Sequence, residues 1–497
     1  MNYRLVINYI GWFLFYYSFV FFILLVPAVV YKENELISVG LETFFCVLCL
    51  GGLAIILTTR GEKKENDNFF TRDSLATVGL VWIAVTILGG LPFFFAGKLS
   101  FIDSVFESIS GFTTTGATVV NDIESFPKTL LFWRALTHFI GGIGIVVIFM
   151  SVLPYLGAGG RLLMESESFA PDMKFIKPRV REAVKQILLV YVSLTLMQCI
   201  LLIIFGMNVF DAICHSFATL GTGGFSTRQM SIESYNSIPI EIITIFFMLC
   251  GATSFALMYQ LYIGNVWNFL KNTEWRVYIG IWGISIIIVT LSLIGINGHF
   301  SLDKTQFPIY SFGKALRYAS FTVTSLFTST GFTNTEYDTW PYIAKWYMMV
   351  IVIIGGCAGS TCGGIKVIRF VILCKFLLNR IYATFQPRVV KSIKVGEQVI
   401  TEDIQKAVLG FFGLWMVIIG ISSIVLCWTG LPIVTSVSAV LVSFGNVGPG
   451  LEYIGGYENY SSIPEIAKVV LSVLMLMGRL EIYSVLVLFF PSFWRSK

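Results

Sequence analysis

Thr114-Thr115-Gly116-Ala117-Thr118 is the most informative stretch of this chain, because variants of it recur three more times. The other copies read Thr222-Gly223-Gly224-Phe225-Ser226, Ser329-Thr330-Gly331-Phe332-Thr333 and Asn446-Val447-Gly448-Pro449-Gly450. Their central glycines are separated by 108, 107 and 117 residues. A quasi-period of this length predicts a fourfold internal repeat.

A segment that is shorter and more polar than a membrane span precedes each of these glycine-containing stretches. The four segments cover residues 102–112, 209–220, 316–328 and 434–444. A helix needs about 20 residues to cross a bilayer, so each segment is too short to span it. Non-helical backbone at membrane depth is tolerated only where it is buried in protein or lines a water-filled path. We therefore expect four re-entrant half-helices, each followed by an extended loop.

The composition indicates that these half-helices lie in a membrane protein. The chain has 497 residues, of which 56% are hydrophobic and 13% charged, and its mean hydropathy is +0.80. Soluble domains carry about 25% charged residues, and the strands of a membrane barrel would alternate apolar and polar residues over about ten positions. The low charged fraction therefore excludes a soluble protein, and the continuous apolar runs exclude a membrane barrel. Ten spans are expected, at residues 10–30, 36–58, 74–96, 129–153, 184–206, 240–263, 276–297, 343–377, 405–429 and 466–490.

Each repeat unit then consists of a span, a half-helix, a glycine-containing loop and a second span. The first two spans stand outside the repeats. The expected divisions are residues 1–70 for the two extra spans, 71–160 for repeat 1, 161–270 for repeat 2, 271–395 for repeat 3 with a broken second helix, and 396–497 for repeat 4.

The distribution of positive charge predicts the orientation. If the half-helices all enter from one side, the opposite side holds 23 of the 34 Lys and Arg residues, and the half-helix side holds 10. The remaining one, Arg479, lies within a span. Because positive residues concentrate on the cytoplasmic side, we expect the half-helices to enter from outside and both termini to be cytoplasmic.

The loops carry chemistry that suits a monovalent cation. Small residues let the backbone extend with its carbonyl groups turned inward, and four such stretches can close a ring of oxygens that replaces the hydration shell of the ion. The negative C-terminal end of a half-helix pointing at that ring would favour the cation further. For any single loop, close helix packing by small residues is the simpler interpretation. Four loops at near-constant spacing favour the ring.

The eighth span contains a second unusual stretch, residues 355–364, with five glycines in ten positions. No stable helix is expected there. Gly359 to Gly364 has the spacing of a phosphate-binding loop, but Ile365 occupies the position of the required lysine, so that motif fails. We expect an intramembrane gating loop, with a packing kink as the alternative.

Arg479 lies near the middle of an apolar span, where a charge costs several kcal/mol unless it is hydrated or paired. Exposure to the conduction path just inside the ring is one explanation for the tolerated charge. A structural ion pair with another helix is the alternative. Glu481 is two residues away on a different helix face, so a pair within the helix is not expected.

Other polar residues near the half-helices have simpler explanations. Asp103 and Asp211 lie at the starts of two half-helices and are expected to be N-caps, with attraction of cations at the mouth as the alternative. His138 and His215 are expected to be packed core residues.

These features resemble the Trk/Ktr/HKT superfamily of potassium transporters, most closely the membrane subunits of its bacterial Trk branch. The resemblance rests on the stretches 110–118 and 222–227, on the glycine-rich part of span eight, on Gly478-Arg479-Leu480-Glu481 and on the two spans before repeat 1. It implies an all-α polytopic membrane protein with four pseudo-symmetric membrane-pore-membrane repeats around one pore. It also implies a homodimer in the bacterial cytoplasmic (inner) membrane and a TrkA-like cytosolic nucleotide-binding regulatory subunit.

The resemblance further implies roles for the quoted residues. Glycine at all four central positions is similar to the potassium-selective pattern of the family. The selectivity filter and its potassium sites would be formed by Thr115, Gly116, Gly223, Gly224, Thr330, Gly331, Val447 and Gly448. The gate would be formed by Gly355, Gly356, Gly359, Ser360, Thr361, Gly363, Gly364 and Arg479.

The expected function is therefore potassium uptake, with potassium as the substrate and no organic cofactor. A sodium-permeable or cation-coupled symporter is the alternative within transport. A polytopic membrane enzyme is the alternative from another class, but Cys357 or Cys362 with His138 is its only loose candidate pair. The lipid bilayer is the expected surrounding, basic loops at 161–185 and 366–394 could dock the regulatory subunit, and no basic tract suggests nucleic acid.

Overall fold

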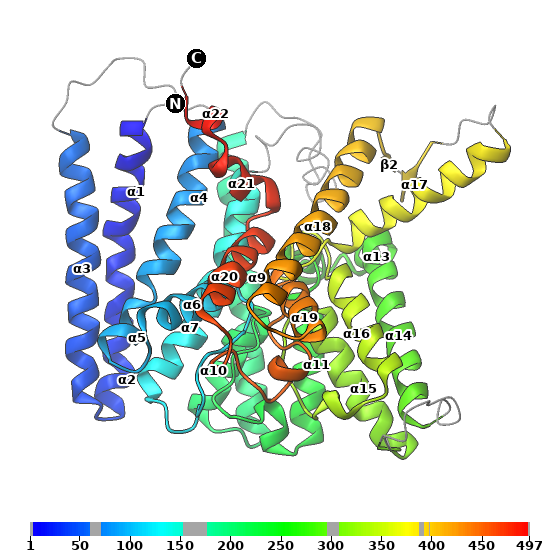
Figure 1. Ribbon diagram of the computed structural model, residues 1–497, viewed down its shortest axis with the longest axis horizontal. Coiled ribbons are helices and arrows are strands. Elements are labelled where there is room, and N and C mark those ends of the chain that lie inside the picture. Colours follow the sequence, from blue (N-terminus) through cyan, green and yellow to red (C-terminus); the bar gives the residue numbers. More distant parts are fainter. Residues whose placement is uncertain are drawn as a thin grey trace.

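The computed structural model describes residues 3–59, 71–152, 176–295, 308–386, 392–396 and 398–495, and it is a bundle of helices (Figure 1). Arg161, Lys174 and the boundary expected between residues 160 and 161 lie outside these residues. Two spans precede the repeats: α1 (Tyr3–Ser18), continued by η1 (Phe19–Leu24) and α2 (Leu25–Val30), and then α3 (Asn34–Thr59). They pack together at one edge of the bundle (Figure 1).

The repeats follow in chain order. Repeat 1 contains α4 (Thr71–Leu88), α5 (Leu91–Phe95), α6 (Phe101–Phe112) and α7 (Lys128–Val152). Repeat 2 contains α9 (Ile176–Ile204), α10 (Val209–Leu220), η3 (Ser231–Tyr235), α11 (Ile238–Gly251), α12 (Phe255–Tyr262) and α13 (Val266–Lys271). Repeat 3 contains α14 (Thr273–Leu293), α15 (Phe312–Phe327), η4 (Tyr337–Thr339), α16 (Tyr342–Ile354), α17 (Val367–Phe385) and β1 (Lys394–Val395). This strand pairs with β2 (Gln398–Val399), so the hairpin lies across the boundary expected between repeats 3 and 4. Repeat 4 contains α18 (Glu402–Trp428), α19 (Ile433–Phe444), η5 (Glu452–Ile454), α20 (Glu465–Arg479), α21 (Ile482–Leu486), η6 (Val487–Phe489) and α22 (Pro491–Trp494).

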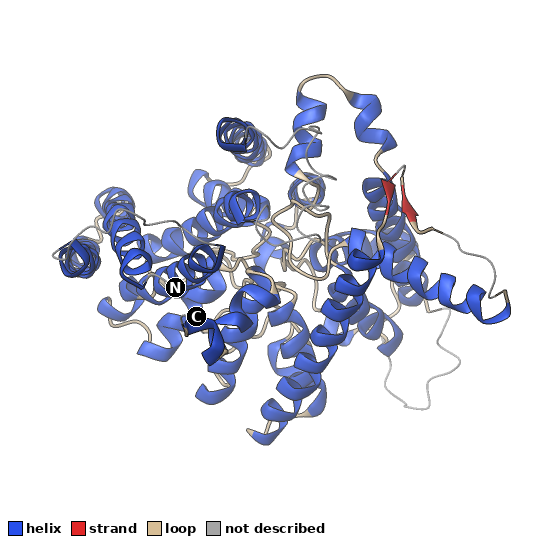
Figure 2. Cartoon of the chain, turned by 90° about the horizontal axis from the view of Figure 1, so that it is seen from above, coloured by secondary structure: helices blue, strands red, loops and turns tan. Residues whose placement is uncertain are grey.

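The four half-helices are α6, α10, α15 and α19, where the sequence predicts them. Each packs against the second helix of the preceding repeat: α6 against α20, α10 against α7, α15 against α11 and α19 against α16. Because the first repeat thereby contacts the last, the four repeats close into a ring in chain order. Seen from above, helices surround a group of loops near the middle of the molecule (Figure 2).

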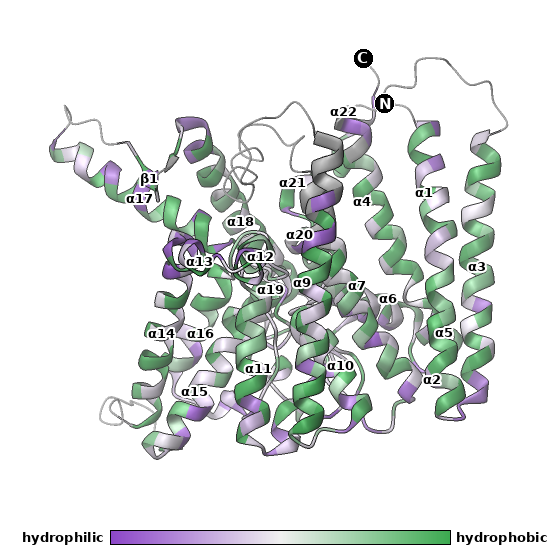
Figure 3. Cartoon of the chain, turned by 180° about the vertical axis from the view of Figure 1, so that it is seen from behind, coloured by the Kyte–Doolittle hydropathy of each residue, from purple (hydrophilic) through white to green (hydrophobic). Residues whose placement is uncertain are grey.

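The helices are apolar enough to lie in a membrane (Figure 3). Six helices of the described residues pass a test of length and hydropathy for a membrane span, and the pair α11 and α12 passes together although it is bent by 109°. The second helices of repeats 3 and 4 are broken, at residues 355–366 and at Leu480 to Glu481. The expectation of ten uninterrupted spans, with a break only in the eighth, was therefore wrong for repeats 2 and 4.

The starts of the half-helices also differ from the expectation. The Ser100 hydroxyl caps α6 by accepting a hydrogen bond from the backbone N–H of Asp103. The Asn208 side chain caps α10 by accepting a hydrogen bond from the backbone N–H of Phe210. Asp103 and Asp211 lie three residues inside the caps, so their assignment as N-caps was wrong. Asp103 instead pairs with Lys468, at 2.7 Å, and Asp211 accepts a hydrogen bond from Thr227, at 2.6 Å.

The two termini lie on the same side of the bundle (Figure 1). The C-terminal segment is held there by the Arg72 guanidinium, which donates to the carbonyls of Ser492, at 2.7 Å, and Arg495, at 3.0 Å. Helix α17 extends from the bundle on this side, and the β1–β2 hairpin lies beside it (Figure 1).

Candidate functional site

Each half-helix ends in the same backbone motif. After each half-helix, one residue that is not glycine adopts the left-handed conformation. These four residues are Thr114, Thr222, Ser329 and Asn446, with φ of 52°, 53°, 53° and 52°. The next backbone N–H returns to the fifth residue before it, at 2.8 Å in all four repeats: Thr115 to Ser110, Gly223 to Ala218, Thr330 to Ser325 and Val447 to Val442. This is the Schellman arrangement, which normally uses glycine at the left-handed position.

The recurrence of this strain is informative. A residue other than glycine in the left-handed region costs about 1–3 kcal/mol and persists only where the surroundings impose it. Four copies of the same cost at equivalent positions indicate that these turns are maintained for a function.

The central glycines come together two residues later. Gly116, Gly224, Gly331 and Gly448 all have positive φ, from 78° to 95°. A Cβ atom added to Gly116 would lie 1.9 Å from the carbonyl oxygen of Gly223, and one added to Gly224 would lie 2.0 Å from that of Thr330. The corresponding distances are 2.1 Å from Gly331 to Val447 and 2.5 Å from Gly448 to Thr115.

These four approaches form a closed circuit. Each glycine lies against the carbonyl group of the residue that precedes the next glycine, and the fourth repeat returns to the first. The structure thus brings together all eight residues that the sequence analysis assigned to a filter, in one ring at the centre of the repeats.

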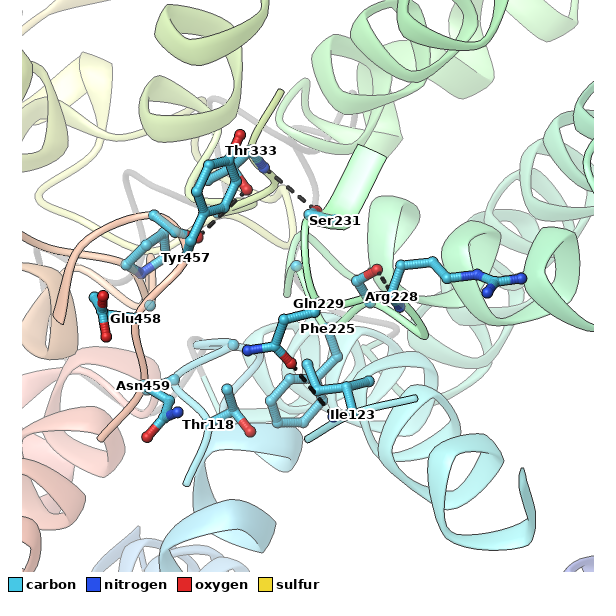
Figure 4. Close-up of a pocket in the computed structure, with 18 of the residues that line it drawn as sticks. Thr118, Ile123, Phe225, Arg228, Gln229, Ser231, Thr333, Tyr457, Glu458 and Asn459 are labelled. Carbon is cyan, nitrogen blue, oxygen red and sulfur yellow. Dashed lines mark hydrogen bonds between the residues drawn. The ribbon is translucent and has the colours of Figure 1, made fainter. Parts of the chain in front are cut away.

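A cavity opens on one side of the ring (Figure 4). It is lined by the four central glycines and by residues that follow them in the chain. Side chains from all four repeats surround it, including Thr118, Gln229, Thr333 and Glu458 (Figure 4). We call this cavity the vestibule. The glycine loops run from the half-helix ends through the ring to the vestibule, so the half-helix ends lie on the other side of the ring.

The loop between α16 and α17, residues 355–366, lies at those half-helix ends. The Thr361 hydroxyl donates to the carbonyl of Leu220, the last residue of α10, at 2.9 Å, and is 3.1 Å from that of Gly251. The Cys357 N–H donates to Ala252 O at 2.9 Å, and the Phe255 N–H donates to Gly359 O at 3.2 Å. The loop of repeat 3 is therefore fastened to the break between α11 and α12 in repeat 2.

Arg479 lies beside this loop and is 4% exposed. Its guanidinium donates to the carbonyl of Thr361 and, at 3.0 Å, to that of Gly141 in α7. No carboxylate of the described residues forms a salt bridge with it. Glu481 pairs instead with Arg369, at 2.8 Å. The guanidinium thus connects repeat 1 to the α16–α17 loop, so the predicted gate residues are brought together.

Several contacts of the site were not predicted from the sequence. The Asn446 amide donates to the Thr115 hydroxyl, at 3.0 Å, which joins the loops of repeats 4 and 1. The Tyr460 hydroxyl donates to Gly448 O at 2.6 Å, and its N–H donates to Thr118 O at 2.7 Å. Glu107 and Arg134 form a buried pair beside the ring, and Arg134 is among the residues that line the vestibule. Only a structure reveals these contacts, because the partners are far apart in the sequence or of ordinary residue types.

The described residues contain no cluster suited to a metal, and they do not form the His138–cysteine pair considered for an enzyme. No group of three or more His, Cys, Asp or Glu residues suited to a metal occurs among them. Both ring nitrogens of the buried His138 lack a hydrogen-bond partner among the residues that the structure describes, so His138 does not pair with Cys357 or Cys362. The Cys362 thiol instead lies 3.1 Å from the Ser329 hydroxyl.

Comparisons with known proteins agree with this architecture. The family model for TrkH, described as a cation transport protein, matches residues 37–496. The chain is 34% identical to the Trk system potassium uptake protein TrkH of Escherichia coli (strain K12), and the match covers 100% of both chains. It is 33% identical to the Trk system potassium uptake protein TrkG of the same strain, and that match covers 99% of both chains. The crystal structure of the potassium transporter TrkH from Vibrio parahaemolyticus superposes with a TM-score of 0.87 at 32% identity, covering 100% of both chains.

These relatives confirm the expected fold class and the expectation of a membrane transporter rather than an enzyme. The resemblance stated from sequence is confirmed over the full length, since both the family model and the curated relatives cover nearly the whole chain. The chain belongs to the TrkH family of cation transport proteins.

Proposed function

We propose that the chain takes up potassium ions across the bacterial cytoplasmic membrane through the ring formed by Thr115, Gly223, Thr330 and Val447 with the central glycines. The observation that carries the proposal is the closed circuit of glycine-to-carbonyl approaches around the ring. Backbone oxygens in such a ring replace the hydration shell of a monovalent cation. The names of the relatives identify potassium as the substrate.

The half-helices support the same proposal. All four end next to the ring, so their C-terminal ends place partial negative charge close to an ion there. The ion needs no charged side chain in the ring, and the ring residues offer none.

The gate would be the α16–α17 loop together with Arg479. Gly355, Gly356, Gly359, Ser360, Thr361, Gly363 and Gly364 belong to this loop, which lies across the half-helix ends. A Cβ atom added to Gly363 would lie 2.2 Å from the carbonyl of Gly445, so the loop packs directly against the end of α19 as well. An ion leaving the ring on this side would meet the loop and a positive charge.

The test is ion flux in proteoliposomes that contain only this protein. We expect potassium flux with a reversal potential that follows the potassium gradient and ignores separate sodium and proton gradients. A reversal potential that moves with sodium or protons would instead support the sodium-permeable or coupled symporter.

Two partners complete the proposal: a second copy of the chain and a TrkA-like cytosolic nucleotide-binding subunit. The side of the termini carries basic residues on α17, such as the exposed Arg380 and the half-buried Lys375, that suit docking of a cytosolic partner. Co-purification of the chain with a soluble nucleotide-binding ring tests the second partner, and cross-linking in membranes tests the first.

A further inference from the structure

Beside the ring, where Arg134 is among the residues that line the vestibule, lies an ion pair that no expected role explains. Arg134 of α7 and Glu107 of α6 are joined at 2.6 Å, and their side chains are 1% and 0% exposed. Burying two charges is unfavourable unless their remaining hydrogen-bonding groups are also satisfied. The partners that satisfy these groups therefore show what the pair holds.

Those partners are the glycine loops of repeats 1 and 2. We call the contact between the glycine loops of two neighbouring repeats a seam, so these two loops form one of the four seams of the ring. The Arg134 guanidinium donates to the Thr118 hydroxyl, at 3.1 Å, and to the Ser226 carbonyl, at 3.3 Å. Thr118 and Ser226 occupy the same position, two residues after Gly116 and Gly224. One guanidinium thus contacts equivalent points of repeats 1 and 2.

Glu107 fixes the first of these loops. Its carboxylate accepts hydrogen bonds from the Val119 N–H, at 2.9 Å, and from the Thr118 hydroxyl, at 3.0 Å. On the other loop, the guanidinium carbon of Arg134 lies 4.1 Å from the centre of the Phe225 ring, which is close enough for a cation–π contact. The Phe225 ring also stacks on His138, at 4.2 Å between centroids.

The seam that this pair spans is the tightest of the four. A Cβ atom added to Gly116 would lie 1.9 Å from Gly223 O, compared with 2.0, 2.1 and 2.5 Å for the equivalent glycines and carbonyl oxygens at the other seams. The other seams are bridged by different groups, such as the Tyr337 hydroxyl on Gly450 O, at 2.9 Å. Within the described residues, Arg134 is the charged side chain that binds the glycine loops of two repeats.

We propose that Arg134 and Glu107 are positioning residues that hold the loops of repeats 1 and 2 in register and so set the preference for potassium over sodium. This inference rests on the proposed function of the ring. A small shift between these loops moves Gly223 O relative to Thr115 O, and therefore changes the size and stiffness of the ring, on which discrimination between the two ions depends.

The experiment measures the permeability ratio of potassium to sodium from reversal potentials of the reconstituted full chain. Arg134→Gln should lower the ratio by about tenfold, which corresponds to about 1.4 kcal/mol. Arg134→Lys should lower it less, because an ammonium group keeps the charge but cannot reach Thr118, Ser226 and Glu107 in one plane. Thermal stability is recorded for each variant.

Arg317→Gln is the matched control. Arg317 forms a two-point ion pair with Glu241, at 2.7 and 2.9 Å, yet its guanidinium bonds to no glycine loop among the described residues. We expect this variant to lose stability and keep the wild-type permeability ratio. An equal loss of selectivity in Arg317→Gln would show that any broken ion pair disturbs the ring, and would overturn the specific role of Arg134.

A double variant separates position from charge. Glu107→Gln with Arg134→Gln removes both charges and should keep the lowered ratio, whereas recovery of the wild-type ratio would show that unbalanced charge was the cause and would overturn the inference. If Arg134→Gln fails to fold, Arg134→Lys decides, and an unchanged ratio there rejects the inference. Absence of potassium flux in the wild-type chain would instead reject the proposed function itself.

Discussion

At the scale of single residues, the ring depends on glycines for which no other side chain has space. Gly116 combines a φ of 83° with the closest approach to a neighbouring carbonyl, so two independent constraints exclude a side chain there. The left-handed residue two positions before it, Thr114, is fully buried, and its turn is fixed by backbone hydrogen bonds from Thr114 to Gly111 and from Thr115 to Ser110.

Gly116→Ser should lower the preference for potassium over sodium. The new Cβ atom would lie 1.9 Å from Gly223 O, so one of the two loops must move. The ratio of permeabilities from reversal potentials measures the effect. Gly420→Ser is the control, because Gly420 lies in α18 with no atom within 4 Å of its Cβ position, and it should behave as wild type. Unchanged selectivity in Gly116→Ser would remove Gly116 from the filter.

Asp338 should make the stability of the loop after the third glycine depend on pH. Burial, together with the nearby carboxylates of Glu336 and Glu452, raises the pKa of Asp338 to about 6, above the ordinary value of about 3.9. The folded state therefore holds the proton more tightly, and stability falls as pH rises from about 4 to about 6 and stays lower above that. Asp338→Asn should raise the melting temperature at pH 8 and leave it unchanged near pH 4.

Asp122 provides a control of opposite sign. Hydrogen bonds from Ser125 lower the pKa of this exposed carboxyl, so its contribution is present at neutral pH and is lost on acidification. Asp122→Asn should therefore lower the melting temperature slightly at pH 8, or leave it unchanged. A parallel rise in both variants at pH 8 would show that general loss of negative charge, and not the environment of Asp338, is responsible.

Sequence reasoning located the ring residues because their signal is a repeated local pattern. It misplaced the caps of the half-helices, since Asp103 and Asp211 are also good cap residues and the choice between them and Ser100 or Asn208 depends on where the helix turn begins. It could not find the pair of Glu107 and Arg134, because 27 residues and a loop separate them.

At the scale of helices, the breaks in the second helices of repeats 2, 3 and 4 place the α16–α17 loop at the half-helix ends, where we propose the gate. The sequence predicted the break in repeat 3, where five glycines in ten residues prevent a helix. It missed the breaks after Gly251 and after Arg479, because each involves few residues inside an apolar run. Tertiary contacts compensate there: Thr361 binds Gly251 O, and Arg479 binds Thr361 O.

Arg479→Ala should increase cation flux while changing stability little. The substitution removes a positive charge beside the half-helix ends and releases the Thr361 carbonyl of the α16–α17 loop. Like-charge repulsion in a region of low effective dielectric reaches several kcal/mol, so its removal eases passage of a cation. Flux in proteoliposomes and the melting temperature are measured together.

Arg369→Ala is the comparison at the same scale. Arg369 pairs with Glu481, only two residues from Arg479, and its loss leaves a partly buried carboxylate without its partner. We expect lower stability and no rise in flux. If Arg479→Ala behaves in this way too, with stability and flux falling together, then Arg479 has a structural role and does not form a barrier to ions.

At the scale of the whole molecule, the ring closes because every half-helix packs on the preceding repeat. The period of the glycines predicted four equivalent units, and the apolar runs predicted a membrane protein. The circular order of the units could not be derived from the residues alone, since hydropathy describes spans one at a time and contains no information on which spans meet. The resemblance to a known family implied four repeats around one pore, and the contacts of α6 with α20 show the order in which the repeats meet.

Uptake through the ring that is driven by the membrane potential alone makes a quantitative prediction for the whole protein. A membrane potential supplies about 2.3 kcal/mol per charge for each 100 mV, and at about 1.4 kcal/mol per decade this amounts to roughly fifty-fold accumulation of a monovalent cation. Proteoliposomes with an inside-negative potential near 100 mV and no sodium gradient should therefore concentrate tracer rubidium to about that ratio. An added sodium or proton gradient should leave the final ratio unchanged. A ratio well above this limit that follows an imposed sodium or proton gradient would establish coupled transport and reject uptake driven by the potential alone.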